Sequence, residues 1–397
     1  MFKQTIYSFI SYIKPEALRP TIAYYLLAVC GGLGIGVLGP TLPSLAEQTG
    51  SSIGQMGLLL LIGSMGSILG TWLSGRLYGK KNAHRILGGA QIGVGCMIAL
   101  MPIVPVLWLL LVVMFFRLLI IRLVSVGYNM LLMWTYGEKM GPVMNGLHFS
   151  LGLGAFLSPL ILAQVFQFGI GYQWVYWLLA FITIGVGVFV YTLPGNPAPP
   201  PEQRNAATEI KPTNYGMILV SALFLLFYVG TELAFSGWLF TYATALGLAN
   251  EVQAAYLTSS FWLAFTFGRL ISIPIATRFA PRQTLFVTIT GSLGFAALMV
   301  IFPSSVKILW LAVIGFGLCM APLWPTGFTL ASQINILDAR LTSLVMLGDS
   351  AGVMVLPWLT GKVMESATPS AMVIVVSISL AAALICVLLM NDPEEVG

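Results

Sequence analysis

Long hydrophobic stretches alternate with short polar segments along the whole chain. Each stretch has the roughly 20 apolar residues that a helix needs to cross the hydrocarbon core of a bilayer. There are twelve, with expected bounds 20–46, 54–78, 86–105, 107–135, 143–168, 171–193, 215–243, 253–276, 283–302, 308–333, 342–364 and 371–390. The pattern predicts an all-α membrane protein with twelve transmembrane helices.

One longer polar segment divides these helices into two sets of six. Residues 194–214 are rich in proline at their start and polar after it, which is typical of a linker. A weak repeat supports the division, because Gly154-Ala-Phe-Leu-Ser-Pro159 and Gly352-Val-Met-Val-Leu-Pro357 have the same spacing from glycine to proline. We expect residues 1–193 and 215–397 to form two pseudo-symmetric six-helix bundles.

Basic residues indicate how the chain is oriented. The segments on the side of the N-terminus carry most of them: Lys3, Lys14, Arg19, Arg76, Lys80, Lys81, Arg85, Lys139, Arg204, Lys211, Arg278, Arg282 and Arg340. The opposite side carries Lys307 and Lys362. By the positive-inside rule both termini and the linker are cytoplasmic. The net charge of +5 is then a topology signal and implies no nucleic-acid partner.

Composition agrees with a multi-pass protein and argues against other classes. The chain has 397 residues, 58% of them hydrophobic and only 8% charged, with a mean hydropathy of +0.93. Such values lie far from those of soluble domains. The cysteines lie singly in expected helices and form no CxxC pair or His/Cys cluster, so no disulfide framework, metal site or cofactor is expected. The two histidines, His84 and His148, have no nucleophile at a recognisable spacing, so an enzyme has little support.

Glu232 is the first candidate for a functional residue. It lies in the middle of the expected helix 215–243, where a carboxylate is costly unless it faces water or a partner. Tyr228, Glu232 and Ser236 are spaced by four residues and therefore lie on one helix face. Glu232 is either part of a solute or coupling site or the structural counter-ion of an arginine.

Other expected helices carry polar stripes as well. Arg122, Ser125 and Asn129 fall on one face of the helix 107–135. The further candidates are Asn145 and His148 in 143–168, Thr258, Trp262, Thr266 and Arg269 in 253–276, Thr326, Thr329 and Gln333 in 308–333, and Asp349 in 342–364. We expect these stripes to meet in a central site.

Several of these residues have a structural alternative. Arg117 and Arg122 are five residues apart, about 140° around a helix, so we expect only one of them to line the cavity. Asp349 and Arg269 are suited to ion pairs that hold helices together. His148 is either a hydrogen-bonded interior group or a ligand or proton site.

Four tryptophans have two interpretations. Trp134, Trp238, Trp262 and Trp324 either stack on a sugar ring or belong to an interfacial belt. Trp238 and Trp262 are the better site candidates, because polar stripes flank them.

Four segments together resemble a known family. The segment 141–159 contains Met144-Asn145-Gly-Leu-His148-Phe, and 228–242, 261–269 and 321–328 complete the set. They resemble major facilitator superfamily sugar porters of the fucose-permease and sodium-dependent glucose transporter 1 type. The resemblance implies a monomer that takes up a monosaccharide by alternating access, coupled to a proton or sodium ion. It also implies that Asn145, His148, Glu232 and Trp238 are the sugar and coupling residues, and that spans one, four, seven and ten line the cavity.

The chain departs from this pattern in span four and after span two. Ser125 stands where relatives have an acidic residue, and Arg122 stands where they have a glycine. Gly79-Lys80 replaces the Asp–Arg pair of the loop after span two. The missing acid weakens the case for ion coupling, and the extra arginine fits either an anionic solute or a salt bridge to Glu232.

The leading hypothesis is a secondary transporter of a monosaccharide or similar polar solute in a plasma or bacterial inner membrane. Asn129, Asn145 and Gln333 would hydrogen-bond hydroxyl groups, while Trp238 and Trp262 would cover the ring faces. The alternative is an organic-anion transporter or exporter that uses the span-four arginines. A solute sensor that does not transport is the third hypothesis.

Overall fold

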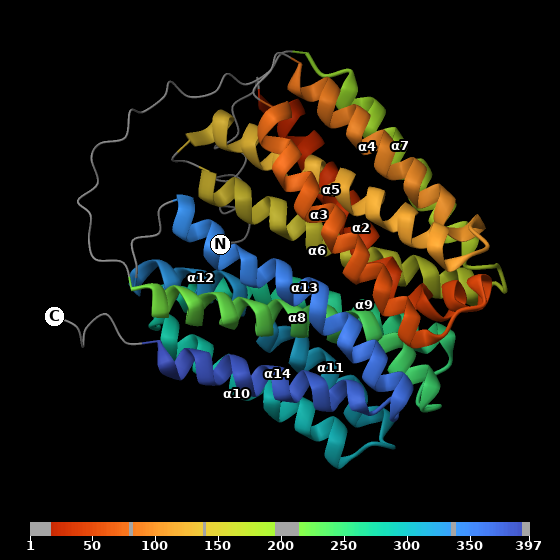
Figure 1. The fold of residues 1–397 in the computed structure, drawn as a ribbon, viewed down its shortest axis with the longest axis vertical. Coiled ribbons are helices and arrows are strands. Elements are labelled where there is room, and N and C mark those ends of the chain that lie inside the picture. The colour runs from red at the N-terminus through yellow and green to blue at the C-terminus, as the bar shows by residue number, and fades with distance from the viewer. Residues whose placement is uncertain (1–16, 79–81, 138–139, 195–213, 335–338, 391–397) are drawn as a thin grey trace, which may run out of the picture.

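The computed structural model describes residues 17–78, 82–137, 140–194, 214–334 and 339–390, and they form an all-helical protein (Figure 1). The first six membrane helices are α2 (Leu18–Thr49), α3 (Ile53–Leu77), α4 (Ala83–Leu100, extended by the 3-10 turn Met101–Ile103), α5 (Leu107–Tyr136), α6 (Met140–Gln167) and α7 (Gln173–Tyr191). The others are α8 (Tyr215–Ala245), α9 (Glu251–Ala276), α10 (Pro281–Ile301), α11 (Val306–Met320) with α12 (Leu323–Ile334), α13 (Ala339–Ser366) and α14 (Ala371–Leu389). Within these residues, 12 spans are long and apolar enough to cross a membrane, which confirms the predicted fold class.

The helices begin where the sequence supplies capping groups. Ser52 and Gln55 form a reciprocal capping box at the start of α3, and Asn250 and Gln253 form another at the start of α9. These side chains satisfy backbone N–H groups that have no partner inside the helix. The tenth span differs from the expected single stretch because it breaks between α11 and α12, beside Pro322, whose ring cannot continue a helix.

The membrane helices form two bundles that lie one above the other in Figure 1, α2 to α7 in red to yellow-green and α8 to α14 in green to blue. The proposed linker 194–214 lies almost wholly outside the described residues, as do the basic residues Lys3, Lys14, Lys80, Lys81, Lys139, Arg204 and Lys211. The domain bounds and the cytoplasmic side therefore stay predictions.

Glycine sets the same close helix crossing in both bundles. Gly154 of α6 lies directly against the backbone of α2 at the carbonyl of Val29. Gly352 of α13 lies in the same way against α8 at the carbonyl of Leu226. In lipid, such small residues let helix backbones approach closely enough for extensive van der Waals contact. The sequence repeat thus corresponds to an equivalent helix pair in each bundle.

The two bundles contact each other at one end of the molecule. Ser259 of α9 donates to the carbonyl of Phe156 in α6 at 2.9 Å, and the Gln164 amide donates to the Tyr256 hydroxyl at 2.5 Å. These residues lie toward the end of α6 and the beginning of α9. The contacts close the end opposite to that where α2 begins and α14 ends.

We predict that Gly154→Ala and Gly352→Ala each lower stability by about 1–3 kcal/mol, because the added methyl group overlaps the facing backbone carbonyl. The matched control is Gly185→Ala in α7, where nothing lies within 4 Å of the new methyl group. Thermal unfolding of the detergent-purified protein measures the difference. Equal melting temperatures for Gly154→Ala and Gly185→Ala would contradict the proposed role of the crossing.

Candidate substrate-binding site

Two connected cavities lie between the bundles. The wide cavity, of about 670 Å³, lies among α5, α6, α8, α9, α10, α12 and α13. The narrow cavity, of about 300 Å³, lies mainly among α2, α3, α5, α8 and α13. Both are lined by Arg122, Ser125, Tyr128, Leu233 and Asp349, so these residues mark the place where the cavities meet.

The wide cavity extends toward the end of the molecule where α2 begins. Its lining includes Asn145 near the start of α6, Ala276 at the end of α9 and Pro281 at the start of α10. Because the opposite end is closed by contacts between α6 and α9, the structure is open on one side only.

Most of the predicted site residues come together in the wide cavity. Its lining contains Arg122, Asn129, Asn145, His148, Glu232, Arg269 and Asp349. They come from both bundles, so the predicted convergence of the polar stripes is present in the fold. Thr266, Thr326 and Thr329 also line this cavity, as their stripes predicted.

Glu232 is held by a neighbour on its own helix. The Tyr228 hydroxyl, one turn earlier on α8, donates to the Glu232 carboxylate at 2.5 Å. Arg269 of α9 is near enough to interact electrostatically with Glu232 and with His148. Its guanidinium lies 4.6 Å from the centre of the Phe265 ring, and its buried Nε has no hydrogen-bond partner among the described residues. Arg269 therefore places a cation on the wall of the wide cavity, beside Glu232 and His148.

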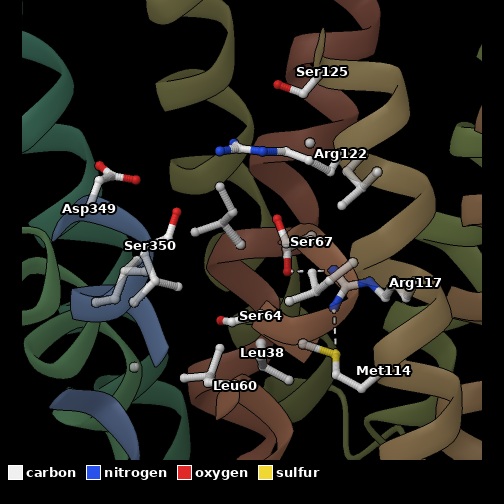
Figure 2. A pocket seen from close by; sticks show the side chains of 18 of the residues that line it. Leu38, Leu60, Ser64, Ser67, Met114, Arg117, Arg122, Ser125, Asp349 and Ser350 are labelled. Atoms are coloured by element: carbon white, nitrogen blue, oxygen red, sulfur yellow. Dashed lines mark hydrogen bonds between the residues drawn. The ribbon is translucent and has the colours of Figure 1, made fainter. Parts of the chain in front are cut away.

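Arg122 and Asp349 face each other from opposite bundles across the cavity (Figure 2). Arg122 donates to the Thr71 hydroxyl at 3.1 Å, and the Trp324 indole donates to the Asp349 carboxylate at 3.1 Å. The suggested salt bridge between Arg122 and Glu232 is not formed among the described residues. This salt bridge is absent because of where the side chains lie. Arg122 reaches toward α3 and Asp349, whereas Arg269 is the arginine near Glu232.

Only Arg122 of the two arginines lines the wide cavity, as expected. Both Arg117 and Arg122 line the narrow cavity, which the expectation did not include. Arg117 is buried and donates to the Gly34 carbonyl of α2 at 2.7 Å, whereas Arg122 reaches Thr71 of α3. The narrow cavity extends along the sides of α5 that face α2 and α3. Arg117 and Arg122 therefore both reach it, although they are well separated around the helix.

Several of the predicted candidates lie outside both cavities, including Thr258, which is buried and donates to the Ala254 carbonyl of its own helix. Trp238 is fully buried between α8 and α13, where it donates to the Pro357 carbonyl at 2.8 Å. Trp262 is buried against the rings of its helix neighbours Phe261 and Phe265. Gln333 lies exposed in the last turn of α12, outside both cavities. Each was assigned from a neighbouring polar stripe, which does not determine which way its own side chain points.

The structure also selects a different tryptophan and adds residues that the sequence interpretation missed. Trp324, which the sequence ranked below Trp238 and Trp262, lines the wide cavity. Ser64, Ser67 and Thr71 of α3 line the narrow cavity. Their spacing of i, i+3 and i+7 is a polar stripe on one helix face, and this signal could have identified them.

Comparison with known proteins agrees with this architecture. Residues 24–335 match the sequence model of the Major Facilitator Superfamily. The chain belongs to the major facilitator superfamily. It is accordingly a secondary transporter and a multi-pass membrane protein, and members of this superfamily are not enzymes.

Curated relatives of this superfamily member share about a quarter of its residues. Sodium-dependent glucose transporter 1A of Mus musculus is 27% identical over 365 residues, which cover 83% of this chain and 86% of the relative. Major facilitator superfamily domain-containing protein 4A of Homo sapiens is 23% identical over 448 residues, covering 88% and 87%.

Solved structures support the fold. The nucleoside transporter NupG has a TM-score of 0.76 at 13% identity, with 95% of this chain and all 100% of that chain covered. A D-xylose-proton symporter has a TM-score of 0.71 at 15% identity, with 94% and 97% covered.

We predict that a cysteine at position 148 reacts with a membrane-impermeant maleimide added on the side where the wide cavity opens, and that one at position 238 does not. The reason is that His148 lines the cavity, whereas Trp238 is fully buried. The measurement is labelling of His148→Cys and Trp238→Cys in oriented vesicles, after the native cysteines are replaced by alanine. Equal labelling at both positions would contradict this assignment.

Proposed function

We propose that this transporter moves a monosaccharide or a similar polar solute across the membrane by alternating access. The observation that supports it best is the set of neutral hydrogen-bonding groups and one tryptophan in the wide cavity, namely Asn129, Asn145, His148, Thr266, Thr326 and Trp324. A sugar presents many hydroxyl groups and two apolar ring faces, which such a lining complements. The volume of about 670 Å³ is within the usual range of small-molecule sites. The sodium-dependent glucose transporters among the relatives favour the same solute class.

Each side chain has a role in this proposal. The amides of Asn129 and Asn145 and the imidazole of His148 bind hydroxyl groups from the side of the N-terminal bundle. Trp324 stacks on the ring from the other bundle, where its indole is held by Asp349. Trp238 is not part of the proposal, because the Pro357 carbonyl already uses its N–H group.

Glu232 is the proposed coupling residue for a proton or sodium ion. A carboxylate within a membrane span favours a proton, a cation or a hydrogen-bond donor as a neighbour. Glu232 has Tyr228 as its donor and lies on the cavity wall, so a solute and an ion reach it through the same opening.

We further propose that the open side is cytoplasmic, in a plasma or bacterial inner membrane, and that the transporter acts as a monomer. The described basic residues Arg19, Arg76, Arg85, Arg278 and Arg282 lie near helix ends on the side where α2 begins. The positive-inside rule assigns that side to the cytoplasm.

A second candidate is an organic anion. Three arginines, Arg117, Arg122 and Arg269, and two carboxylates, Glu232 and Asp349, line the two cavities. This excess of positive charge favours a solute that carries a carboxylate.

The deciding experiment for the sugar proposal measures labelled monosaccharide uptake in proteoliposomes, with proton and sodium gradients imposed separately. We expect one gradient to drive accumulation, and Glu232→Gln to abolish accumulation while exchange of solute across the membrane continues. The reason is that the amide keeps the shape of the site and loses the ionisable group. Glu365→Gln is the matched control, because Glu365 pairs with Lys362 outside the cavities. Full accumulation by Glu232→Gln would exclude Glu232 as the coupling residue.

The anion candidate gives a different result in the same vesicles. It predicts no monosaccharide flux, saturable uptake of a labelled sugar acid, and a loss of that uptake of at least about tenfold in Arg122→Gln, since a charged hydrogen bond contributes about 1.5–3 kcal/mol. Uptake of the sugar acid that is unchanged in Arg122→Gln would exclude Arg122 as the anion anchor.

A further inference from the structure

Arg117 is a buried cation in the closed part of the membrane region. Its side chain is only 5% exposed, and it lies on the wall of the narrow cavity. Its guanidinium donates to the Gly34 carbonyl at 2.7 Å and to the Met114 sulfur at 3.5 Å. A guanidinium has five N–H donors, so these two neutral acceptors leave donors over for another group.

No carboxylate neutralises this charge. Among the described residues, none lies within ion-pair distance of the Arg117 guanidinium. Asp349, the carboxylate that lines the same cavity, accepts from Trp324 and faces Arg122 (Figure 2). An isolated charge in a low-dielectric interior is very costly, so a buried cation needs a nearby anion.

A second buried group in the same cavity lacks a partner. Ser64 of α3 is 3% exposed, and its hydroxyl has no hydrogen-bond partner among the described residues. Figure 2 shows Ser67 of α3 near the guanidinium of Arg117, and Ser64 farther from it on the same helix. All three residues line the narrow cavity. Buried hydroxyl groups are almost always hydrogen-bonded, so the unpartnered Ser64 hydroxyl leaves a donor for a ligand in the cavity that also holds the unneutralised cation.

The backbone of α2 leaves room for the Arg117 guanidinium at Gly34. Gly34 lies so close to the Arg117 guanidinium that a side chain at this position would overlap it. Leu38, Leu60 and Met114 form apolar walls around the polar groups. Such walls favour a weakly hydrated ion. With Asp349 facing Arg122, one positive charge is left over in the cavity, which favours a monovalent anion.

We propose that the narrow cavity binds a small monovalent anion at Arg117, with the hydroxyl groups of Ser64 and Ser67 as additional donors. The anion is either a free halide or a carboxylate group carried by the solute. The site lies beyond the wide cavity, toward the closed end of the pathway.

The test is equilibrium binding of labelled chloride to the purified full-length protein at constant ionic strength, balanced with sodium isethionate. We expect saturable binding that Ser64→Ala weakens about tenfold, because a hydrogen bond to a charged group contributes roughly that factor or more. Ser158→Ala is the matched control: Ser158 is also buried without a hydrogen-bond partner, but it does not line the cavity. Arg117→Gln should abolish chloride binding. If the Arg117→Gln protein does not fold, the comparison of Ser64→Ala with Ser158→Ala still decides the test.

Competition identifies the source of the anion. Displacement of labelled chloride by bromide at lower concentration than by acetate or glucuronate supports a free halide. Displacement by glucuronate at lower concentration than by acetate or bromide supports a carboxylate on the solute. Binding that does not saturate, or that Ser64→Ala and Ser158→Ala leave equal, overturns the site. Monosaccharide flux is measured separately, so a failure of the sugar proposal is distinguishable from a failure of this one.

Discussion

The cost of placing charge inside a membrane protein determines how this structure is organised. Arg117, Arg122, Glu232, Arg269 and Asp349 all lie within membrane-spanning helices, and all five line one of the two connected cavities. Charges at that depth are stable only beside water, a counter-charge or a bound ligand. Each bundle contributes some of them, so neither bundle is a complete site alone. The same constraint that excludes these residues from the lipid surface therefore places the solute pathway between the bundles.

Close helix contacts occur within each bundle and between the bundles. Inside each bundle, glycines such as Gly154 and Gly352 bring helix backbones together. Between the bundles, Gly39 lies against Gly237, and the closed end also carries the hydrogen bonds of Ser259 with the Phe156 carbonyl and of Gln164 with Tyr256. Individual hydrogen bonds of this kind are separable at modest cost. The architecture thus favours rocking of two rigid bundles around a fixed site, as in other transporters built from repeats.

The sequence was sufficient to predict the helices and many of the polar residues that line the wide cavity, and the reason is physical. Hydrophobic length depends on bilayer thickness, and polar spacing fixes the relative angle of residues on one helix. Neither quantity fixes the rotation of a helix against its neighbours. This is why Asn145 and Glu232 were placed correctly by their stripes, while Trp238 and Trp262 were not: their polar neighbours face the cavity, and their own rings pack into a bundle. Of the two span-four arginines, only Arg122 lines the wide cavity, as predicted, but both line the narrow one, because a cavity can extend along more than one side of a helix.

The span-four departures from the resembled sugar porters lie together in the fold. Ser125 and Arg122, for which the resemblance implies an acid and a glycine in those porters, both lie where the wide and narrow cavities meet. Together they make this junction more positive by two charges, one lost from the acid and one gained from arginine. Asp349 faces Arg122 from the other bundle and offsets part of that change, but Arg117 beyond the junction has no such neighbour among the described residues. The fold is therefore that of the superfamily, and the uncompensated charge of this chain lies at Arg117 in the narrow cavity. The anion proposed for this cavity would neutralise that charge.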